Sequence, residues 1–589
     1  MRRDLTTRWG RDVDPEHVLQ EYPRPQLVRD SYLNLNGWWG YAITPASTPP
    51  PTTYDGRILV PFSPEAPLSQ VDRQLQPDER LTYRRPLRLP DGFVPAGGRA
   101  LLHFGAVDQT CTVRLDGVEV GANEGGYLPF TCDVTAASTP GEHELVVDVR
   151  DRSDGAQHAS GKQRLHRGGI WYTAQSGIWQ TVWVEAVPAG HVEALTLVPH
   201  LADGSVDVTV HASGGVAVVL VEEQEHQVPV GETVTIFLDD PRPWTPDEPH
   251  LHDVEVLLGP DRLTSYFAMR SFGVGPDAAG VPRLLLNGVP HLPVGVLDQG
   301  YWPDGLLTAP SDAALVHDIT TMKGLGFDLL RKHAKVEPLR WYAHCDRIGM
   351  LVWQDVVNGG GRNRTVAVTW PGRYPIRLGD TGGKPWLGRG DEIGRALFRE
   401  ELRRTIEHLR NVASLCCWVL FNEGWGQFDA AAVAGEVRTL DPTRLVDHAS
   451  GWHDQGGGDL RSLHVYGKRF RLPRRRDDRP VVLSEYGGHS LRTDGHVYYD
   501  EVDFGYGQEP TRHELAASFT RLHDTLADDV RRGLSATVYT QVSDVEDELK
   551  GLLTYDREVL KLDAEVVRAA LHRLRTAFAE AVRVPTVTT

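Results

Sequence analysis

The segment Cys417-Trp-Val-Leu-Phe-Asn-Glu-Gly-Trp-Gly-Gln427 runs from an apolar strand directly into a carboxylate flanked by an amide and an indole. A second segment, Val481-Val-Leu-Ser-Glu-Tyr-Gly-Gly488, repeats this pattern further along the chain. In each, an apolar strand places a glutamate at its carboxyl end. Because all strands of a parallel β/α barrel open on one face at that end, we expect Glu423 and Glu485 to share a pocket.

The region around these segments alternates between strand-like and helical patterns. From about residue 275, short apolar runs alternate with amphipathic stretches, and eight such strands predict a (β/α)8 TIM barrel over 275–589. The expected strands are 291–296, 328–332, 350–354, 417–421, 445–448, 462–465, 481–484 and 536–541. The expected helices are 311–324, 338–348, 391–411, 430–440 and 511–532. Helices are expected to be irregular or missing after the fifth and sixth strands, where 451–461 is Gly-rich and 468–480 is rich in Arg and Pro.

The residues before the barrel read as all-β. Short alternating runs separated by Gly, Pro and Asp predict a jelly-roll β-sandwich over 1–187, with a hairpin turn at Asp116-Gly117. Strand-like runs at 205–212, 216–221, 233–238 and 253–258 predict a small Ig-like sandwich over 188–274. The sequence therefore predicts three domains.

Composition restricts the partners of the chain. It has 589 residues, 40% of them hydrophobic, and a formal charge of −18, which disfavours nucleic acid because phosphates repel acidic surfaces. The short basic run at 474–476 is expected to be a solvated loop. No apolar run is long enough for a membrane span. The five cysteines include no CxxC pair, and the start of the chain has no apolar stretch, so we expect a cytoplasmic protein without disulfides.

Two carboxylates at a barrel mouth suit chemistry on acetals. One carboxyl group must donate a proton to the departing oxygen, while the other must be ionised to attack or to activate water. Beside them, Trp425 offers an apolar face to a sugar ring and Asn422 offers an amide to a ring hydroxyl. Glu423 and Glu485 are therefore the candidate catalytic pair.

Other polar residues come where barrel strands should end, and they are candidates for substrate binding. These residues are Arg331, His333, Trp353, Asp355, His464, Tyr466 and Tyr539. A cation beside a nucleophilic carboxylate lowers its pKa, and a Tyr hydroxyl can hold one of its oxygens. Arg331 and Tyr466 are the residues that we expect in those two roles. The spacing of His, Asp and Glu predicts no metal site, and no cofactor is expected.

Further motifs, in this order along the chain, resemble glycoside hydrolase family 2, the family of β-galactosidases, β-glucuronidases and β-mannosidases. These motifs are Tyr22-Pro-Arg-Pro-Gln26, Leu35-Asn-Gly-Trp38, Gly125-Gly-Tyr-Leu-Pro-Phe130, Gly168-Gly-Ile-Trp-Tyr-Thr-Ala-Gln-Ser-Gly-Ile-Trp-Gln180, Arg270-Ser-Phe-Gly273 and Leu286-Asn-Gly288. The segments 422–423 and 484–487 match the acid/base and nucleophile motifs of that family. The resemblance covers nearly the whole chain.

The resemblance implies a jelly roll, an Ig-like sandwich and a barrel, and an exo-acting glycosidase that retains anomeric configuration. By this resemblance Glu485 is the nucleophile, Glu423 is the acid/base, and Asn422 binds the 2-hydroxyl of the sugar. The glucuronidases of the family hold the sugar carboxylate with an Asn-x-Lys-Gly signature. Here the comparable segment is Glu548-Leu-Lys-Gly551, and the acidic residue disfavours a uronate.

The sequence is compatible with several functions. β-Galactosidase activity is the first expectation, with β-mannoside, α-L-arabinoside, β-galactofuranoside and β-glucuronide as alternative substrates. A transglycosylase would use the same covalent intermediate. A carbohydrate-binding protein without catalysis could use Trp38, Trp39, Trp171 and Trp179 for stacking. A homo-oligomer is possible in each case.

Overall fold

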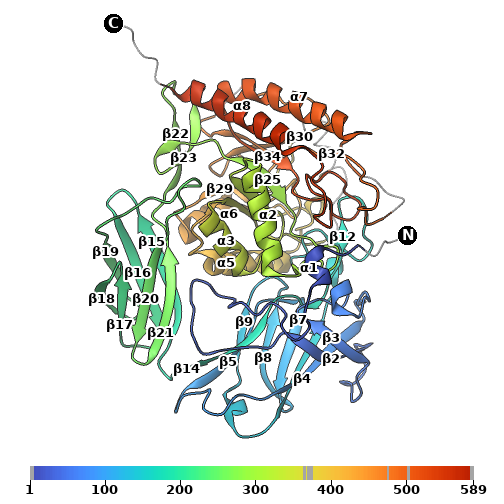
Figure 1. The fold of residues 1–589 in the computed structure, drawn as a ribbon, viewed down its shortest axis with the longest axis vertical. Coiled ribbons are helices and arrows are strands. Elements are labelled where there is room, and N and C mark those ends of the chain that lie inside the picture. The colour runs from blue at the N-terminus through green and yellow to red at the C-terminus, as the bar shows by residue number, and fades with distance from the viewer. Residues whose placement is uncertain (1–4, 362–366, 368–375, 474–476, 500–503, 584–589) are drawn as a thin grey trace.

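The computed structural model describes residues 5–361, 367, 376–473, 477–499 and 504–583. The basic run 474–476 and part of the long segment 358–390 lie outside the described residues. Figure 1 shows three parts, with the first strands below, a second group of strands to the left and the barrel in the centre. The chain is thus an assembly of β-sandwiches and a barrel; the division at residues 187 and 274 stays a prediction.

The first part packs two antiparallel sheets face to face, as predicted for a jelly roll. One sheet has the order β1-β14-β5-β9 and the other the order β3-β2-β4-β10-β7-β8. Their bounds are β1 (Tyr32–Asn34), β2 (Gly37–Pro45), β3 (Gly56–Val60), β4 (Glu79–Leu87), β5 (Arg99–Phe104), β7 (Thr110–Leu115), β8 (Val118–Glu124), β9 (Phe130–Asp133), β10 (His143–Arg150) and β14 (Val182–Val187). Alternate residues of β10 are buried, which puts Leu145, Val147 and Val149 in the core between the sheets.

Short strands connect this sandwich to the rest of the chain. Two pairs, β6 with β13 and β11 with β12, lie among the loops of the jelly roll, and β22, β23 and β24 form a small sheet before the barrel. Their bounds are β6 (Val107–Asp108), β11 (Gln163–Arg164), β12 (Tyr172–Thr173), β13 (Gly177–Ile178), β22 (Phe272–Pro276), β23 (Pro282–Leu286) and β24 (Val289–Pro290).

The second sandwich also has two sheets, of orders β15-β16-β19 and β18-β17-β20-β21. Their bounds are β15 (Val192–His200), β16 (Ser205–Ala212), β17 (Val216–Val221), β18 (Gln224–Pro229), β19 (Thr233–Phe237), β20 (His252–Leu258) and β21 (Asp261–Phe267). Valines that alternate along β16 and β17 fill the space between the sheets, among them Val206, Val208 and Val219. This arrangement agrees with the predicted small sandwich.

The barrel is a parallel sheet of eight strands in the order β29-β28-β27-β26-β25-β34-β31-β30. Their bounds are β25 (Val294–Asp298), β26 (Leu329–Lys332), β27 (Leu351–Asp355), β28 (Leu415–Val419), β29 (Leu445–Asp447), β30 (Arg461–Tyr466), β31 (Val481–Gly487) and β34 (Leu534–Thr540). All eight predicted strands are present, displaced by a few residues. The barrel is nearly but not fully closed. Strands β29 and β30 lie at the two ends of the sheet order and do not pair with each other.

The helices outside the barrel include all five that were predicted. Their bounds are α2 (Asp312–Gly324), α3 (Leu339–Ile348), α5 (Glu392–Leu409), α6 (Ala430–Leu440), α7 (Arg512–Arg531) and α8 (Ala564–Val582). The side chains of Ser311, Asp391, Thr511 and Asp563 cap α2, α5, α7 and α8. As predicted, the described residues between β29 and β30 and between β30 and β31 contain no helix. Helix α8, which lies beside α7 (Figure 1), and the single turn α1 (Arg8–Arg11) were not predicted from the sequence.

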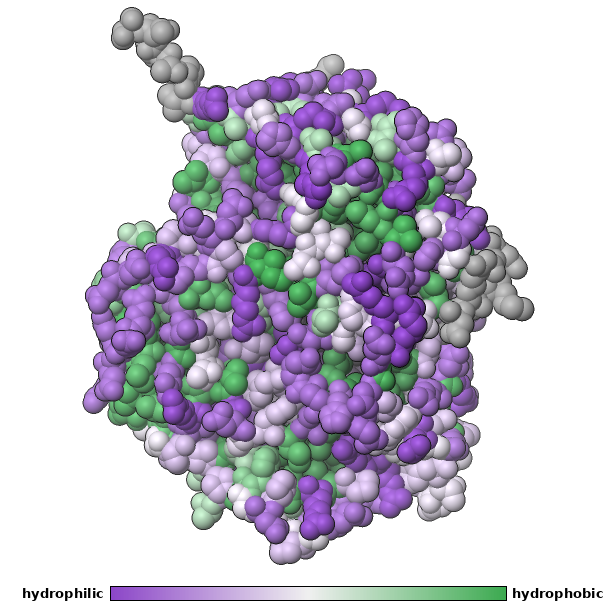
Figure 2. Space-filling model, viewed as in Figure 1, coloured by the Kyte–Doolittle hydropathy of each residue, from purple (hydrophilic) through white to green (hydrophobic). Residues whose placement is uncertain are grey.

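The cysteines and the surface of the protein give little information about its binding partners. All five cysteines are buried and free. Figure 2 shows a largely hydrophilic face with scattered apolar patches. Among the described residues, every helix is too short or too polar to cross a bilayer.

Candidate active site

The first glutamate follows β28 in a tight turn. The chain passes from buried Phe421 through Asn422 to Glu423, whose φ of 52° lies in the left-handed region. The backbone N–H of Glu423 donates to the carbonyl of Ser450 over 2.9 Å, which ties this turn to the segment after β29. A strained backbone that is anchored in this way is typical of functional positions.

The second glutamate lies within β31, where the ladder is irregular on both sides. The register of β31 shifts toward β34 between Leu483 and Tyr486, and the register of β30 shifts between Leu463 and His464. Such irregularities re-aim side chains, and they are common beside active sites. Here they accompany Glu485, which is 6% exposed.

The two glutamates lie together at the barrel mouth. One carboxylate oxygen of Glu423, one of Glu485 and a ring nitrogen of His464 all lie within 4.8 Å of one another. His464 Nδ1 is 2.9 Å from Glu423 Oε1 and 3.6 Å from Glu485 Oε2. The imidazole of His464 therefore bonds to Glu423 and lies close to Glu485, although the two glutamates are far apart in the sequence.

Arg331 on β26 is the centre of the hydrogen-bond network. Its guanidinium is fully buried and donates to both oxygens of Asp355, at 2.9 and 2.8 Å. It also donates to Asn422 Oδ1 at 2.8 Å and to Glu485 Oε1 at 3.1 Å. A planar fork with five donors suits this multiple contact, which a lysine could not make. The guanidinium thus fixes three acceptors from three different strands or strand ends.

Tyr466 holds the other oxygen of the second glutamate. Its hydroxyl donates to Glu485 Oε2 over 2.5 Å and lies 2.9 Å from Thr540 Oγ1. Its ring stacks on Tyr506, with centroids 3.8 Å apart. Both oxygens of Glu485 therefore have donors, and the carboxyl group is held in one orientation.

These contacts decide the charge of Glu485. Burial alone would raise the pKa of its carboxyl group, but the neighbouring side chains of His464, Arg331 and His333 and the hydroxyl of Tyr466 outweigh burial and hold the pKa well below its usual range. Burial also opposes ionisation of Asp355, whose pKa is nevertheless lowered because Arg331 and His333 face it. Glu485 is accordingly ionised at neutral pH.

Beside the carboxylates lies a small cavity with an aromatic wall. His333 Nδ1 is 2.5 Å from Asp355 Oδ2, and its ring centroid lies 6.1 Å from that of Trp425. The ring centroid of Trp425 in turn lies 4.9 Å from that of Trp171, which belongs to the jelly roll. The two indoles, His333 and Asn422 line the cavity together with loop residues. Residues of the jelly roll and of the barrel therefore meet at this mouth.

Two candidate binding residues lie elsewhere. Trp353 is fully buried in the apolar cluster inside the barrel, with Leu329 and Leu351. Tyr539 packs against Tyr486, Phe519 and His523, between β34 and α7. These neighbours are apolar side chains and aromatic rings of the core, so the structure does not bring either residue to the carboxylates.

Several residues of the site were not predicted from the sequence. Thr540, next to Tyr539, is the residue of β34 that reaches Tyr466. Ser450 Oγ lies 2.9 Å from His464 Nε2 and bonds to Ser484 Oγ at 3.0 Å, so hydroxyl groups support the imidazole from behind. Single Ser and Thr residues form no recognisable motif in one sequence, so these residues could not be predicted as part of the site. Trp171 had a signal, because it stands in one of the quoted family motifs, but only as a possible stacking residue of the jelly roll.

The group of Glu423, His464 and Glu485 could also offer ligands to a metal ion. The donor atoms of Glu423, His464 and Glu485 lie close enough for that. However, Glu485 already accepts hydrogen bonds from Arg331 and Tyr466, and a guanidinium 3.1 Å from its Oε1 repels a further cation. The donor set therefore suits proton transfer and nucleophilic attack better than metal binding.

Comparison with known proteins identifies the family. Residues 309–558 match the TIM barrel domain of glycosyl hydrolases family 2, and residues 63–179 match the glycosyl hydrolase 2 galactose-binding domain-like family. The chain belongs to glycoside hydrolase family 2. The first match lies in the barrel and the second in the jelly roll, the two parts of the chain that carry the quoted family motifs at 125–130, 168–180, 422–423 and 484–487.

Among relatives in this family, a β-galactosidase of Thermoanaerobacter pseudethanolicus is 23% identical over 442 residues, which cover 70% of this chain and 54% of that enzyme. A β-galactosidase of Enterobacter cloacae is 26% identical over 66% of this chain and 38% of its own length. The chain thus spans about half or less of these two enzymes.

Among solved family 2 structures, the fold is matched over almost the whole chain. A β-glucuronidase of an uncultured Clostridium sp. has a TM-score of 0.69 at 16% identity and covers 94% of this chain and 99% of its own. A β-galacturonidase of Eisenbergiella tayi bound to galacturonate gives the same TM-score and coverage at 18% identity. At such identities the likeness concerns the fold alone.

Proposed function

We propose that this member of family 2 is an exo-acting glycoside hydrolase that releases a terminal sugar with retention of configuration. The observation that carries the proposal is the group of Glu423, His464 and Glu485, whose donor atoms lie within 4.8 Å of one another. Retaining glycosidases need carboxyl groups ~5–5.5 Å apart, whereas inverting enzymes leave ~6.5–9.5 Å for a water molecule. The short separation supports direct attack by one of the carboxylates.

In the first step, Glu485 attacks the anomeric carbon. Its ionised state supports this role, since a carboxylate with a lowered pKa keeps its electron pair free at neutral pH. The bond from the anomeric carbon to the leaving oxygen breaks as the ester bond to Glu485 forms. Glu423 gives its proton to the leaving oxygen, so the aglycone departs as a neutral alcohol.

In the second step, Glu423 acts as a base. It takes a proton from an incoming water molecule, whose oxygen attacks the anomeric carbon and displaces Glu485. His464 Nδ1, 2.9 Å from Glu423 Oε1, orients that carboxyl group in both steps. The products are the free sugar and the two carboxyl groups in their starting states.

Neighbouring groups are assigned to binding. Asn422, whose amide oxygen accepts from Arg331, is proposed to bond to the 2-hydroxyl of the sugar, a contact that strengthens in the transition state. Trp425 and Trp171 offer apolar faces for a ring at the mouth of the site. Asp355 holds Arg331, His333 bonds to Asp355, and both residues line the same cavity.

The substrate is proposed to be uncharged at the sugar. Lys550 Nζ lies 2.9 Å from Glu548 Oε1, so its charge is already neutralised. Glu548 also accepts from the hydroxyl of Tyr172 at 2.5 Å and from Gln541 Nε2 at 3.2 Å. A β-galactoside is the first choice, ahead of β-mannosides, α-L-arabinosides and β-galactofuranosides, and a β-glucuronide is disfavoured.

The function is tested by incubating the full chain with nitrophenyl glycosides of pyranoses and furanoses. We expect release of nitrophenol from at least one neutral glycoside, with the retained anomer as the first product seen by NMR. Glu485→Gln is expected to abolish turnover on every substrate. Absence of hydrolysis across the panel would instead support a carbohydrate-binding protein, and new glycosides formed at high acceptor concentration would indicate a transglycosylase.

Location and assembly belong to the same proposal. Five buried free thiols favour a reducing compartment such as the cytoplasm. A homo-oligomer stays a prediction that light scattering on the full chain can test.

A further inference from the structure

An exposed aromatic ring lies close to the catalytic carboxylates, and the proposed hydrolysis does not use it. Tyr506 is 39% exposed, although one face of its ring is covered. That face stacks on Tyr466, with centroids 3.8 Å apart and planes at 13°. The hydroxyl of Tyr466 in turn donates to Glu485. One side chain therefore separates the exposed ring of Tyr506 from the proposed nucleophile.

The backbone holds Tyr506 at the ends of β30 and β31. Its N–H donates to the carbonyl of Gly488 over 2.9 Å, directly after β31. The next two residues form β33 (Gly507–Gln508), which pairs with β32 (His489–Ser490). Gly488 has a φ of 71°, and a Cβ there would lie 2.7 Å from Cδ2 of Tyr506, so glycine makes room for the ring. Tyr506 is thus fixed at the rim of the barrel mouth.

Lys550 lies beside the two stacked rings and not on the outer face of Tyr506. Its Nζ is 4.9 Å from the centroid of Tyr506 and 5.8 Å from that of Tyr466. An ammonium group above the outer face would be farther from Tyr466 than from Tyr506 by nearly the whole spacing of the rings. Phe504 meets Tyr506 at 73°, with centroids 5.7 Å apart, so it is not a second parallel partner. The exposed part of Tyr506 therefore lies on its outer face and edges.

Tyr506 lies on the side from which the leaving group departs. Partial burial raises the pKa of Tyr506 well above its usual range, and the charge of Glu423 raises it further, ahead of Glu548 and Glu485. The hydroxyl is thus within electrostatic reach of Glu423. In the proposed hydrolysis Glu423 gives its proton to the departing oxygen, so the aglycone leaves along the side of Glu423. The exposure of Tyr506 agrees with this placement, because an exo-acting enzyme encloses the terminal sugar and leaves the aglycone at the surface.

The chemistry of this rim suits a ring without charge. An aromatic face stacks on other aromatic rings and on the apolar face of a sugar. The ammonium group of Lys550 at the edge of Tyr506 is paired with Glu548 at 2.9 Å. Its charge is therefore not available to select an anionic aglycone.

We propose that Tyr506 is a specificity-determining residue, whose outer face stacks on a ring in the aglycone next to the bond that is cleaved. The inference rests on the proposed hydrolysis and adds to it the class of leaving group. That leaving group is an alcohol built on an uncharged ring, which is either a second sugar or an aromatic alcohol. Tyr506 binds this ring and does not contact the anomeric carbon.

The test compares three substrates of the neutral sugar that the nitrophenyl panel identifies: the glycosyl fluoride, the 4-nitrophenyl glycoside and a disaccharide. The fluoride carries no aglycone ring. Each variant is compared with wild type on the same substrate, so the intrinsic reactivity of the leaving group cancels. We expect Tyr506→Ala to lower kcat/KM about ten-fold for at least one of the two ring substrates, and less than about two-fold for the fluoride. The ring substrate that loses more tells whether the aglycone is a sugar or an aromatic alcohol.

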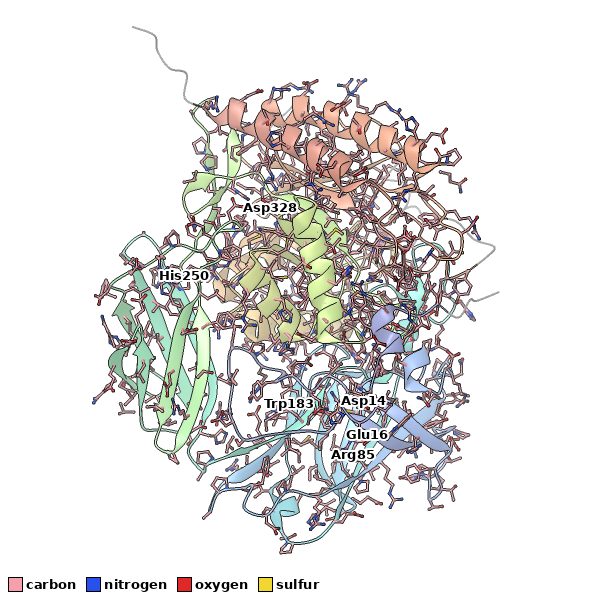
Figure 3. All side chains as sticks on the ribbon, in the orientation of Figure 1. Asp14, Glu16, Arg85, Trp183, His250 and Asp328 are labelled. Carbon is pink, nitrogen blue, oxygen red and sulfur yellow. The ribbon has the colours of Figure 1, made fainter. Side chains whose placement is uncertain are left out.

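Two further variants separate stacking from other effects. Tyr506→Phe keeps the ring and should stay within about two-fold of wild type on all three substrates. The control is His250→Ala, which removes a ring that contacts His252, with centroids 4.6 Å apart. His250 lies beside the second sandwich (Figure 3), well away from β30 and β32 (Figure 1), and its loss should change no ratio between the substrates. If Tyr506→Ala does not fold, Tyr506→Leu takes its place with the same expectation.

Two outcomes would overturn this proposal alone. One is an unchanged kcat/KM for both ring substrates in Tyr506→Ala. The other is an equal loss on all three substrates together with a moved acid limb, which would mean that Tyr506 acts only by holding Tyr466. If the wild-type protein cleaves none of the substrates, the proposed hydrolysis itself fails and this inference fails with it. The two failures are therefore distinguished by the activity of the wild type.

Discussion

Arg331 is held by Asp355 through two parallel hydrogen bonds of 2.9 and 2.8 Å, and this pair aims the guanidinium at Glu485. Asp355 is 2% exposed and Arg331 fully buried. A buried pair of this kind is weak evidence for extra stability, but breaking one half leaves an uncompensated charge. The pair is therefore a sensitive place to test the network.

Asp355→Asn should destabilise the protein by about 3–5 kcal/mol, because it leaves the buried guanidinium short of one carboxylate. Denaturant unfolding followed by fluorescence measures the change. The control is Asp240→Asn, which breaks an exposed pair with Arg242 and should cost no more than about 1 kcal/mol. Equal losses in the two variants would mean that Asp355 does not hold Arg331 as the structure indicates.

The sequence predicted the parts that depend on long patterns. Apolar runs that end in polar residues were enough to find all eight barrel strands and to select Glu423 and Glu485. It could not decide which way each neighbour of a strand end points. Tyr539 and Thr540 are consecutive, yet the first packs on Phe519 of α7 while the second reaches Tyr466.

The reason is that the face of the sheet on which a side chain lies depends on the register of its strand, and the register of β31 shifts beside the site. Between Leu483 and Tyr486 the pairing of β31 with β34 changes, so simple alternation cannot be carried across this position. Similarly, Trp353 looked suitable as an aromatic at a strand end, but the interior of the barrel needs large side chains to fill it. Contacts between distant segments, such as Trp171 with Trp425, follow only from the packing of the jelly roll on the barrel.

Tyr466→Phe should move the acid limb of the kcat/KM profile to higher pH by roughly one unit, because one charge-assisted hydrogen bond to Glu485 is lost. The sign follows from the lowered pKa of Glu485, which the hydroxyl of Tyr466 helps to hold down. Without that hydroxyl the pKa rises, so protonation of the nucleophile on the acid side begins at a higher pH.

The matched control for this variant is Tyr506→Phe. Tyr506 stacks on Tyr466 at 3.8 Å, and the substitution keeps the stacked ring. Its acid limb should stay within about 0.3 pH units of wild type, well below the shift of about one unit expected when the bond is lost. An unmoved acid limb in Tyr466→Phe would remove Tyr466 from the control of the nucleophile.

Glu423→Ala should slow hydrolysis by about 10²–10⁴-fold for a poor leaving group, since general acid catalysis is lost. The loss should be much smaller for a dinitrophenyl glycoside, which needs no proton to depart. Added azide should then restore the rate and give a glycosyl azide of retained configuration, because a small anion can replace water without a base.

The contrast with the second glutamate makes this prediction specific. Glu485→Gln should respond neither to the leaving group nor to azide, because no covalent intermediate forms. Chromatography of the products with the two variants side by side provides the measurement. If azide rescued Glu485→Gln and not Glu423→Ala, the two roles would have to be exchanged.

Glu548→Gln should change the preference for charge at the sugar. In the wild-type protein Glu548 neutralises Lys550 at 2.9 Å, and a glutamine can still accept from Tyr172 while leaving the ammonium group unpaired. The ratio of kcat/KM for a nitrophenyl β-glucuronide or β-galacturonide to that for the neutral glycoside should rise by ten-fold or more. The control is Glu546→Gln, because Glu546 is buried nearby but accepts from the backbone of Thr173 instead of pairing with Lys550. A ratio that moves equally in both variants would show that general loss of negative charge, and not the release of Lys550, governs this preference.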